Sequence, residues 1–311
     1  MIKIAHITTI DLSLKYLLLN QLVFIKDQGY QVTGISSPGP YVKDLEDAGI
    51  RHIPVLISRR LISPLADLVS LIRLVGLFRQ EEFQIVHVHT PKASFLGQVA
   101  ARIAGVPIVI RTLHGFYFHD GTQPLLRRAM ILLERFAARF SDAILSQNSE
   151  DIQTAIENRI CPSEKISYLG NGIDLHLFSP EAVDPEKLAQ AREEFGLDPN
   201  KRVVGFVGRL VAEKGVLEIF QTAKILSSQF DDLQFLIVGP VEEAKIDGVT
   251  PQMAADQGIE EICKFVGFQD DMPLIYALMD IFILPSHREG FPRSLMEAWG
   301  WPMASAQMLY C

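Results

Sequence analysis

Two glutamates near the end of the sequence have a spacing that suits a nucleotide sugar. Glu289 and Glu297 follow an apolar run at residues 281–284, and seven residues separate them. If Pro292 occupies the first helical turn, Glu289 lies in the preceding loop and Glu297 lies inside the helix. A helix rises ~1.5 Å per residue, so the two carboxylates can lie on the order of 10 Å apart. That distance spans a sugar ring and the ribose of a nucleotide diphosphate sugar, and carboxylates accept hydrogen bonds from the vicinal hydroxyls of both rings.

The backbone between the two glutamates is a second candidate. The predicted helix start at Gly290, Phe291, Pro292 and Arg293 can hold a diphosphate on its free N–H groups. The alternative is a solvated loop followed by an exposed helical glutamate. The preceding strand and the basic loop described next favour the binding interpretation.

A glycine-rich turn earlier in the chain carries two cations. The predicted strand at residues 202–207 is followed by Gly208 and Arg209, and then by Lys214, where a helix begins. Two cations beside a helix N-terminus indicate a diphosphate site, and a surface turn with solvated charges is the alternative. The absence of a G-x-G-x-x-G motif here and after the first predicted strand argues against an NAD-type site.

Histidines mark the ends of two predicted strands in the N-terminal half. His114 follows the apolar run at residues 107–112, where the carboxyl ends of parallel strands bind ligands, although a packed structural histidine is the alternative. His89 and Lys92 are predicted on the acceptor side, and His87 is predicted in the core. Alternation places His87 and His89 on one face, but no third ligand has a telling spacing, so no metal site is expected.

The segment 125–140 carries four arginines among leucine, isoleucine, methionine and phenylalanine. They are Arg127, Arg128, Arg135 and Arg139. A basic amphipathic helix can lie on an anionic membrane surface. A half-buried helix with one solvated face explains the same pattern, so both interpretations stay open.

Apolar runs rich in isoleucine and valine alternate with amphipathic stretches, which predicts doubly wound α/β sheets. Strands are expected near residues 2–8, 31–36, 52–57, 84–89, 107–112, 142–146 and 165–169, and again near 202–207, 233–238, 262–266 and 281–285. Helices are expected near 14–28, 41–48, 64–80, 92–104, 124–140, 149–158, 186–195, 215–228, 273–279 and 292–299. The predicted organisation is a first domain at 1–170, a proline-rich linker at 171–200 and a second domain at 201–311.

Composition narrows the class of protein. The 311 residues carry a net charge of −8, which argues against a general nucleic-acid binder. The three cysteines are far apart, so a disulfide framework or a zinc site is not expected. No apolar run is long enough to predict a membrane-spanning helix, and the first residues predict a strand rather than a signal peptide. A cytoplasmic location is therefore expected.

These motifs together resemble the retaining glycosyltransferases of family 4, which have the GT-B fold of two Rossmann-like domains facing a cleft. The likeness covers about residues 1–298 and is carried by the Glu289/Glu297 motif, Gly208-Arg209, Glu213-Lys214-Gly215, Asn171-Gly172-Ile173-Asp174 and Thr112-Leu113-His114-Gly115. Segments 37–41 and 89–93 are similar to the capsule, O-antigen and exopolysaccharide branch.

The resemblance implies a role for each site residue. Arg209 and Lys214 would hold the donor diphosphate, and Glu297 would hold the ribose. Glu289 would bind hydroxyls of the transferred sugar with help from the backbone at 290–293, and His114 would lie beside the reacting centre. No metal is needed in such enzymes, because the cations and the helix end neutralise the leaving diphosphate. Retention implies attack from the face that the leaving phosphate occupies.

The implied reaction moves a hexosyl or N-acetylhexosaminyl unit from a nucleotide sugar, by family frequency a UDP-sugar. The acceptor would be a saccharide, or one linked to polyprenyl diphosphate at the inner membrane face, in bacterial surface polysaccharide synthesis. A nucleotide-sugar 2-epimerase of similar fold is one alternative. An inactive fragment that binds without turnover is another.

The sequence departs from the family pattern at two places. Residues 8–13 replace a glycine pair common in the family, which leaves Thr9 and Asp11 as candidates for the acceptor side. After Trp299 the family pattern of a further strand and helices is not recognisable. We therefore expect a truncated or frameshifted second domain, no native strand in residues 299–311, and a poorly active, aggregation-prone chain.

Overall fold

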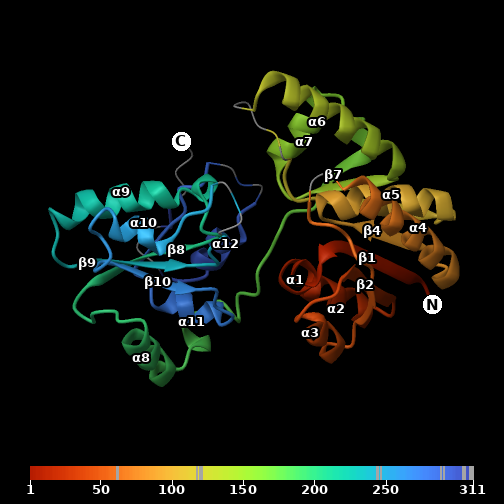
Figure 1. Ribbon diagram of the computed structural model, residues 1–311. Coiled ribbons are helices and arrows are strands. Elements are labelled where there is room, and N and C mark those ends of the chain that lie inside the picture. Colours follow the sequence, from red (N-terminus) through yellow and green to blue (C-terminus); the bar gives the residue numbers. More distant parts are fainter. Residues whose placement is uncertain are drawn as a thin grey trace. The chain divides into compact units, whose positions relative to one another are not determined.

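The computed structural model divides into two compact units, Met1–Gly170 and Asn171–Cys311. The residues described are 1–60, 63–116, 118, 122–242, 245, 247–287, 289, 291–302 and, for the backbone only, 306–307. Each unit is built on its own parallel sheet (Figure 1). Among these residues no helix is both long enough and apolar enough to cross a membrane.

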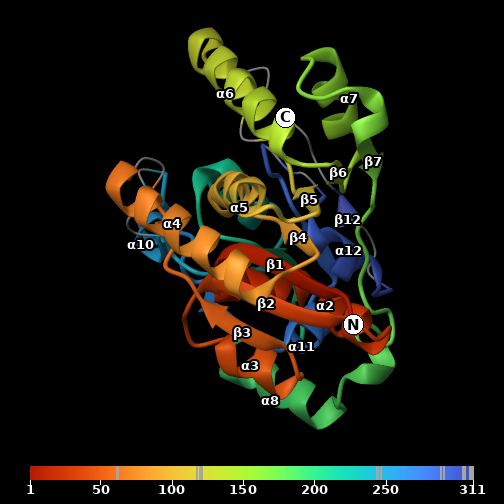
Figure 2. The same cartoon turned by 90° about the vertical axis from the view of Figure 1, so that its right-hand side faces the viewer.

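The first unit holds a seven-stranded parallel sheet in the order β3-β2-β1-β4-β5-β6-β7, which can be followed in Figure 2. Its strands are β1 Lys3–Ile10, β2 Gln31–Ser37, β3 Arg51–Pro54, β4 Ile85–Val88, β5 Ile108–Leu113, β6 Ala143–Ser146 and β7 Ile166–Tyr168. Its helices are α1 Asp11–Ser13, a π-helical turn Leu14–Leu18, α2 Leu19–Asp27, α3 Val42–Asp47, α4 Pro64–Glu81, α5 Pro91–Ala104, α6 Pro124–Ala137 and α7 Ser149–Glu157. Short 3₁₀ turns lie at Ala138–Phe140 and Ser163–Lys165.

Helices cover both faces of this sheet because its strands are apolar on both sides. On β2, Val32 packs with Leu22 of α2, whereas Ile35 packs with Leu74 of α4. An odd separation along a strand places two side chains on opposite faces, so the two clusters lie on opposite sides of the sheet. The prolines that begin α4, α5 and α6 favour those starts, because proline has no N–H that needs a partner.

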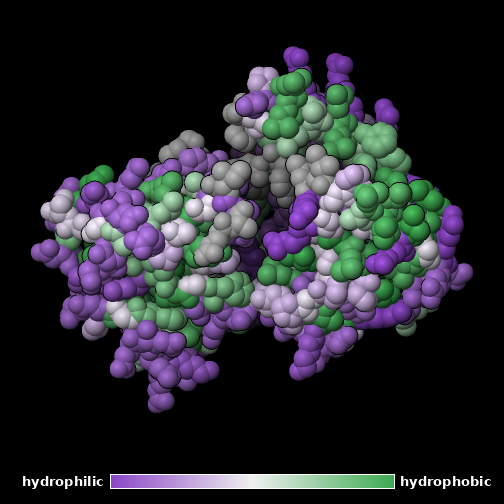
Figure 3. Space-filling view, in the orientation of Figure 1, coloured by the Kyte–Doolittle hydropathy of each residue, from purple (hydrophilic) through white to green (hydrophobic). Residues whose placement is uncertain are grey.

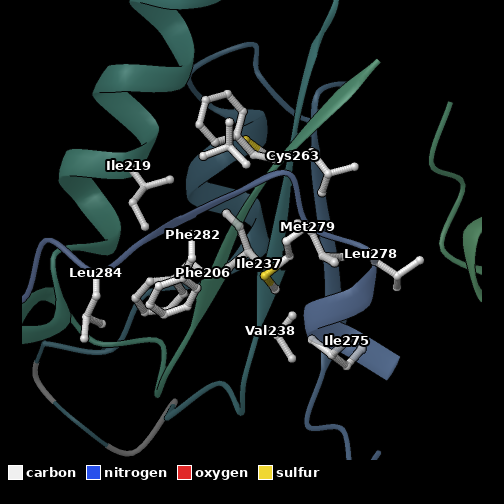
Figure 4. Close-up of a cluster of buried hydrophobic side chains, with 14 of the residues drawn as sticks. Phe206, Ile219, Ile237, Val238, Cys263, Ile275, Leu278, Met279, Phe282 and Leu284 are labelled. Atoms are coloured by element: carbon white, nitrogen blue, oxygen red, sulfur yellow. The ribbon is translucent and has the colours of Figure 1, made fainter. Parts of the chain in front are cut away.

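The second unit holds a parallel sheet in the order β10-β9-β8-β11-β12. Its strands are β8 Arg202–Val207, β9 Leu233–Val238, β10 Cys263–Gly267, β11 Ile281–Ile283 and β12 Ala306–Gln307. Its helices are α8 Pro185–Glu194, α9 Val216–Ser227, α10 Pro251–Ala255, α11 Met272–Ala277 and α12 Arg293–Trp299, with 3₁₀ turns at Pro180–Ala182 and Ala212–Lys214. Figure 4 shows the core, where Phe206 of β8 and Phe282 of β11 are fully buried among aliphatic side chains.

The segment 171–200 belongs to this second core. Phe178, Ala191 and Leu197 are buried in it, and α8 contacts α11. The prolines and charges that suggested a linker therefore mark turns and a solvated helix face on a packed segment.

The expectation that residues 299–311 contain no strand is wrong. Ala306 and Gln307 form β12, which pairs in parallel with Phe282 and Ile283 of β11. An open strand edge presents unpaired N–H and C=O groups, so an extended segment that returns after α12 can pair with it. The sequence around β12 has no β-branched residues, which is why its pattern did not predict a strand.

Candidate active site

Each sheet has one place where the strand order reverses. In the first unit it lies between β1 and β4, and in the second it lies between β8 and β11. In open parallel α/β sheets, ligands bind beyond the carboxyl ends of the strands at such a point, because the connections leave there in opposite directions. Most of the predicted site residues lie in the loops that follow these strands.

In the second unit, the loops after β8 and β11 join through an ion pair. The Lys214 Nζ lies 2.6 Å from Glu289 Oε1, with side chains only 17% and 10% exposed. The backbone N–H of His287 and the hydroxyl of Ser286 both donate to the carbonyl oxygen of Glu213. The structure therefore brings together the predicted diphosphate cation and the predicted sugar carboxylate.

Two glycines allow the loop after β8 to approach the loops after β9 and β11. Gly215 has φ +75°, and a Cβ there would lie 2.0 Å from the Pro285 carbonyl oxygen. The Gly208 carbonyl packs against Gly239, where a Cβ would lie 1.8 Å from it. A side chain at Gly215 or at Gly239 would push these backbones apart, so both positions require glycine.

Glu297 lies on α12 and is buried, with 6% of its surface exposed. Its Oε1 accepts a 2.7 Å hydrogen bond from Arg293 Nε, and its Oε2 accepts a 3.0 Å bond from the Tyr276 hydroxyl. Burial raises the pKa of Glu297, and the charge of Arg293 and the bonds from Arg293 and Tyr276 oppose that rise. Pro292 is the residue before the helix rather than part of its first turn, because its ψ is extended.

The remaining predicted donor residues differ in their surroundings. Arg209 is half-buried beside Gly208, and its side chain has no hydrogen-bond or ion-pair partner within the described part of the chain. Phe291 precedes Pro292 and is half-buried. Gly290 lies outside the described residues. Arg293 is predicted to bind the donor diphosphate, but in the structure its Nε donates a hydrogen bond to Glu297.

In the first unit, four histidines form a continuous cluster. His6 of β1 lies with its Nδ1 3.0 Å from His89 Nε2, and His89 Nδ1 lies 3.4 Å from His114 Nε2. His114 Nδ1 lies 3.0 Å from Gln147 Oε1, and His87 Nε2 lies 2.7 Å from the Thr112 hydroxyl. The neighbouring strands β1, β4 and β5 bring these side chains together.

The direction of this chain of hydrogen bonds follows from its last acceptor. The Gln147 amide oxygen can only accept a hydrogen bond, so His114 Nδ1 must carry the hydrogen and donate it. His114 Nε2 then has no hydrogen and accepts from His89 Nδ1–H. His89 Nε2 then accepts from His6 Nδ1–H. Each of the three rings is therefore a neutral Nδ1–H tautomer, and His6 Nε2 is a buried acceptor without a partner among the described residues.

Burial keeps all four rings neutral. It lowers the pKa of His6 to about 3 and the pKa values of His87 and His89 well below the usual range. Burial also lowers the pKa of His114, although the Gln147 bond opposes this. Repulsion between neighbouring rings, which would arise if they were protonated, lowers the pKa values of His87 and His89 further, and the charge of Arg111 does so for His114.

The structure places a third histidine beside His87 and His89. His6, His87 and His89 each offer a nitrogen, and these atoms all lie within 4.8 Å of one another. The third ring comes from β1, a different strand, so spacing along β4 could not reveal it. A metal ion bound by His89 would have to displace one of the two hydrogen bonds that this ring makes with His6 and His114.

The other predicted acceptor-side residues are engaged within the first unit. Thr9 donates its N–H to the Thr90 hydroxyl at 2.8 Å, and the two hydroxyls lie 2.7 Å apart. Asp11 is 4% exposed and accepts a 2.8 Å bond from the backbone of Tyr41. Lys92 donates to the Arg60 carbonyl and to the Ser63 hydroxyl, and it pairs with Asp67 at 2.8 Å.

Sequence reasoning missed His6, Gln147 and Tyr276. Gln147 follows β6, the neighbour of β5, so the rule that places ligands at carboxyl strand ends would have found it. Tyr276 lies on α11 and reaches Glu297 only through the packing of that helix, and no signal in the sequence pointed to it.

The histidine cluster predicts a loss of stability in mild acid. These histidines have lowered pKa values in the folded state, so the unfolded chain binds more protons once the pH falls below about 6.5. Each such histidine should cost about 1.3 kcal/mol between pH 7.5 and pH 5.5. In urea titrations, His6→Asn should flatten the dependence of unfolding free energy on pH by about that amount. His176→Asn, at an exposed position, is the control, and equal slopes for both variants would contradict the prediction.

Comparison with known proteins assigns the family. Residues 19–172 match the glycosyl transferase 4-like domain, and residues 189–300 match the glycosyl transferases group 1. The chain is 31% identical to an Escherichia coli UDP-Gal:alpha-D-GlcNAc-diphosphoundecaprenol alpha-1,3-galactosyltransferase, over 96% of this chain and 76% of that protein. It is 30% identical to the capsular polysaccharide biosynthesis glycosyltransferase CapM of Staphylococcus aureus, over 95% of this chain and 76% of that protein.

The structure of Anabaena HepE, solved with UDP and glucose, matches with a TM-score of 0.77 at 21% identity, over 96% of this chain and 78% of that one. The chain belongs to the family 4 glycosyltransferases and has the two Rossmann-like units of the GT-B fold.

Proposed function

We propose that this glycosyltransferase moves a hexosyl or N-acetylhexosaminyl unit from a UDP-sugar to a saccharide carried on a polyprenyl diphosphate, with retention. The reaction belongs to the synthesis of a bacterial surface polysaccharide. The observation that carries the proposal is the buried Lys214–Glu289 pair at the β8/β11 reversal point. The substrates after which the E. coli relative is named and the capsular role of the S. aureus relative support it.

The second unit is proposed as the donor site. Lys214 and Arg209 would face the diphosphate, with the backbone at 290–293 completing the site. A carboxylate has about four acceptor positions. Among the described residues Glu289 and each Glu297 oxygen accept one bond, so further acceptor positions remain for sugar and ribose hydroxyls. Arg293 would act chiefly by orienting Glu297.

The chemistry proposed needs no nucleophile from the enzyme. The acceptor hydroxyl oxygen bonds to the anomeric carbon on the face from which the diphosphate leaves. The bond from that carbon to the phosphate oxygen breaks, and the same oxygen takes the hydroxyl proton. His114 is proposed beside this centre, where its neutral ring is oriented by Gln147.

Replacement of the two glutamates is expected to impair different quantities, UDP affinity for Glu297 and kcat for Glu289. A hydrogen bond to a charged group contributes roughly 1.5–3 kcal/mol, so losing one should cost at least about tenfold. Glu297→Ala should weaken UDP binding by that factor in calorimetry. Glu289→Ala should leave UDP affinity within about threefold and lower kcat instead.

Glu193→Ala, on the exposed face of α8, is the matched control and should change neither quantity. Equal loss of UDP affinity in the Glu289 and Glu297 variants would show that the division of roles is incorrect.

Donor binding is proposed to be independent of metal ions. The cations Arg209 and Lys214 supply the positive charge, and no two aspartates in the sequence are spaced as D-x-D. EDTA should leave turnover unchanged, and added Mn²⁺ should not raise it. Elemental analysis of the purified protein tests the histidine cluster separately. Turnover that EDTA abolishes and Mn²⁺ restores would contradict the proposal.

Contact with an anionic membrane is proposed through α6 and the end of α7. Exposed leucines on α6 lie beside a basic hollow between the two helices, and Figure 3 shows apolar and charged surface together there. The charged residues that line the hollow are Arg127, Arg128, Arg135 and Arg159, together with a single carboxylate, that of Glu157. These cations would attract anionic headgroups while the leucines enter the interface.

Sedimentation with lipid vesicles tests this contact. Phosphatidylglycerol vesicles should bind the protein, and pure phosphatidylcholine vesicles should bind it at least about tenfold more weakly. Arg128→Glu combined with Arg159→Glu should remove the preference for anionic lipid, whereas Lys187→Glu on α8 should not. Equal binding to both kinds of vesicle would contradict the proposal.

A further inference from the structure

A cavity of about 640 Å³ opens in the first unit beside the β1/β4 reversal point. It is lined by the end of β1, the segment before α4, and helices α5 and α6. The hydroxyls of Thr9 and Thr90, which bond to each other, lie at its strand end. Its size is that of a small-molecule site, and its position is where a parallel sheet binds ligands.

One side of the cavity is apolar. Phe95 of α5 and Met130, Leu133 and Ala137 of α6 contribute to its lining. Leu133 is 55% exposed, so this apolar lining continues to the protein surface. Further exposed leucines lie on α6 and on α4, and Figure 3 shows apolar surface over this part of the unit. An apolar chain could therefore enter the cavity from an apolar phase outside.

The other side of the cavity is polar, and some of its buried polar atoms have no hydrogen-bond partner among the residues described. Ser94 Oγ, Gln98 Oε1 and Arg111 Nε are buried, and none has a hydrogen-bond partner among the residues described. All three residues line the cavity. Buried polar atoms normally have partners, so these atoms mark a place for polar groups of a ligand or for water.

The charges at the cavity indicate an anionic head. Arg59 and Arg60 are exposed and contribute to its lining, whereas Lys92 is already bonded to the segment before α4 and to Asp67. Arg111 is paired with Glu134 at 2.5 Å and contributes no net charge. The two exposed arginines are therefore the cations available to a ligand, and planar guanidinium groups match phosphate geometry.

We propose that this cavity binds the diphosphate and the first isoprene units of the lipid-linked acceptor. The diphosphate lies at Arg59 and Arg60, and the isoprene units lie against Phe95, Met130 and Leu133. The rest of the lipid leaves over the exposed face of α6. This inference rests on the proposed function, because it specifies the acceptor of that reaction.

Calorimetry of the whole chain with farnesyl diphosphate, in the presence of saturating UDP, tests the inference without turnover. Farnesyl diphosphate should bind at least about tenfold more tightly than inorganic diphosphate or farnesol, because it alone carries both groups. Leu133→Trp, which fills the cavity, should weaken that binding about tenfold or more. Ile103→Trp is the matched control: this residue near the end of α5 is 52% exposed, does not line the cavity, and should leave affinity within about twofold.

Arg59→Gln combined with Arg60→Gln should weaken farnesyl diphosphate binding and leave farnesol binding unchanged. Equal affinity for all three probes, or equal effects of the two tryptophan variants, would overturn the inference. Circular dichroism of each variant confirms that it folds. If farnesyl diphosphate binds as expected but no UDP-sugar is turned over, the proposed function fails and the cavity assignment stands. If sugar is transferred to a water-soluble acceptor but farnesyl diphosphate does not bind, only the cavity assignment fails.

Discussion

Parallel strand pairing is the constraint on which both candidate sites depend. Because every strand in a parallel sheet points the same way, the loops that follow neighbouring strands meet at one edge. Residues 214 and 289 are far apart in sequence, yet their side chains form an ion pair because β8 and β11 are adjacent in the sheet. The same rule brings Thr9 to Thr90 at the ends of β1 and β4. Where the strand order reverses, no crossover covers that edge, and polar side chains stay accessible to ligands.

Both units bury polar side chains near their candidate sites, and burial has a different effect in each unit. In the second unit, Tyr276 and Arg293 hold Glu297 in one orientation, so its remaining lone pairs have fixed directions. In the first unit, burial keeps a chain of imidazoles neutral, and their hydrogen bonds hold His114 with one defined tautomer. Groups fixed in this way need little reorganisation when a charged substrate arrives, which is the main means by which enzymes stabilise developing charge.

The surface of the first unit is the basis for the proposed contact with lipid. Helices α4 and α6 expose leucines although their opposite faces pack on the sheet or on neighbouring helices. Scattered apolar residues on a surface need no explanation, but here they adjoin a cavity with arginines at its edge and a basic hollow between α6 and α7. Apolar and cationic surfaces side by side are the combination that an anionic lipid requires.

The sequence by itself determined most of the secondary structure, without α10 and β12, and the parallel α/β class, because apolar runs and amphipathic stretches are local properties of the chain. It also identified Lys214, Glu289 and Glu297 as residues that could bind a nucleotide sugar, since their motifs are short and contiguous. Only the tertiary structure decided which of these side chains meet. It brought His6 to His89 across two strands, tied Glu297 to Tyr276 on another helix, and engaged Asp11 and Lys92 within the first unit. It also placed the segment 171–200 in the second core and paired β12 with β11. These features depend on contacts between residues distant in sequence, and such contacts leave no periodic pattern from which they could be predicted.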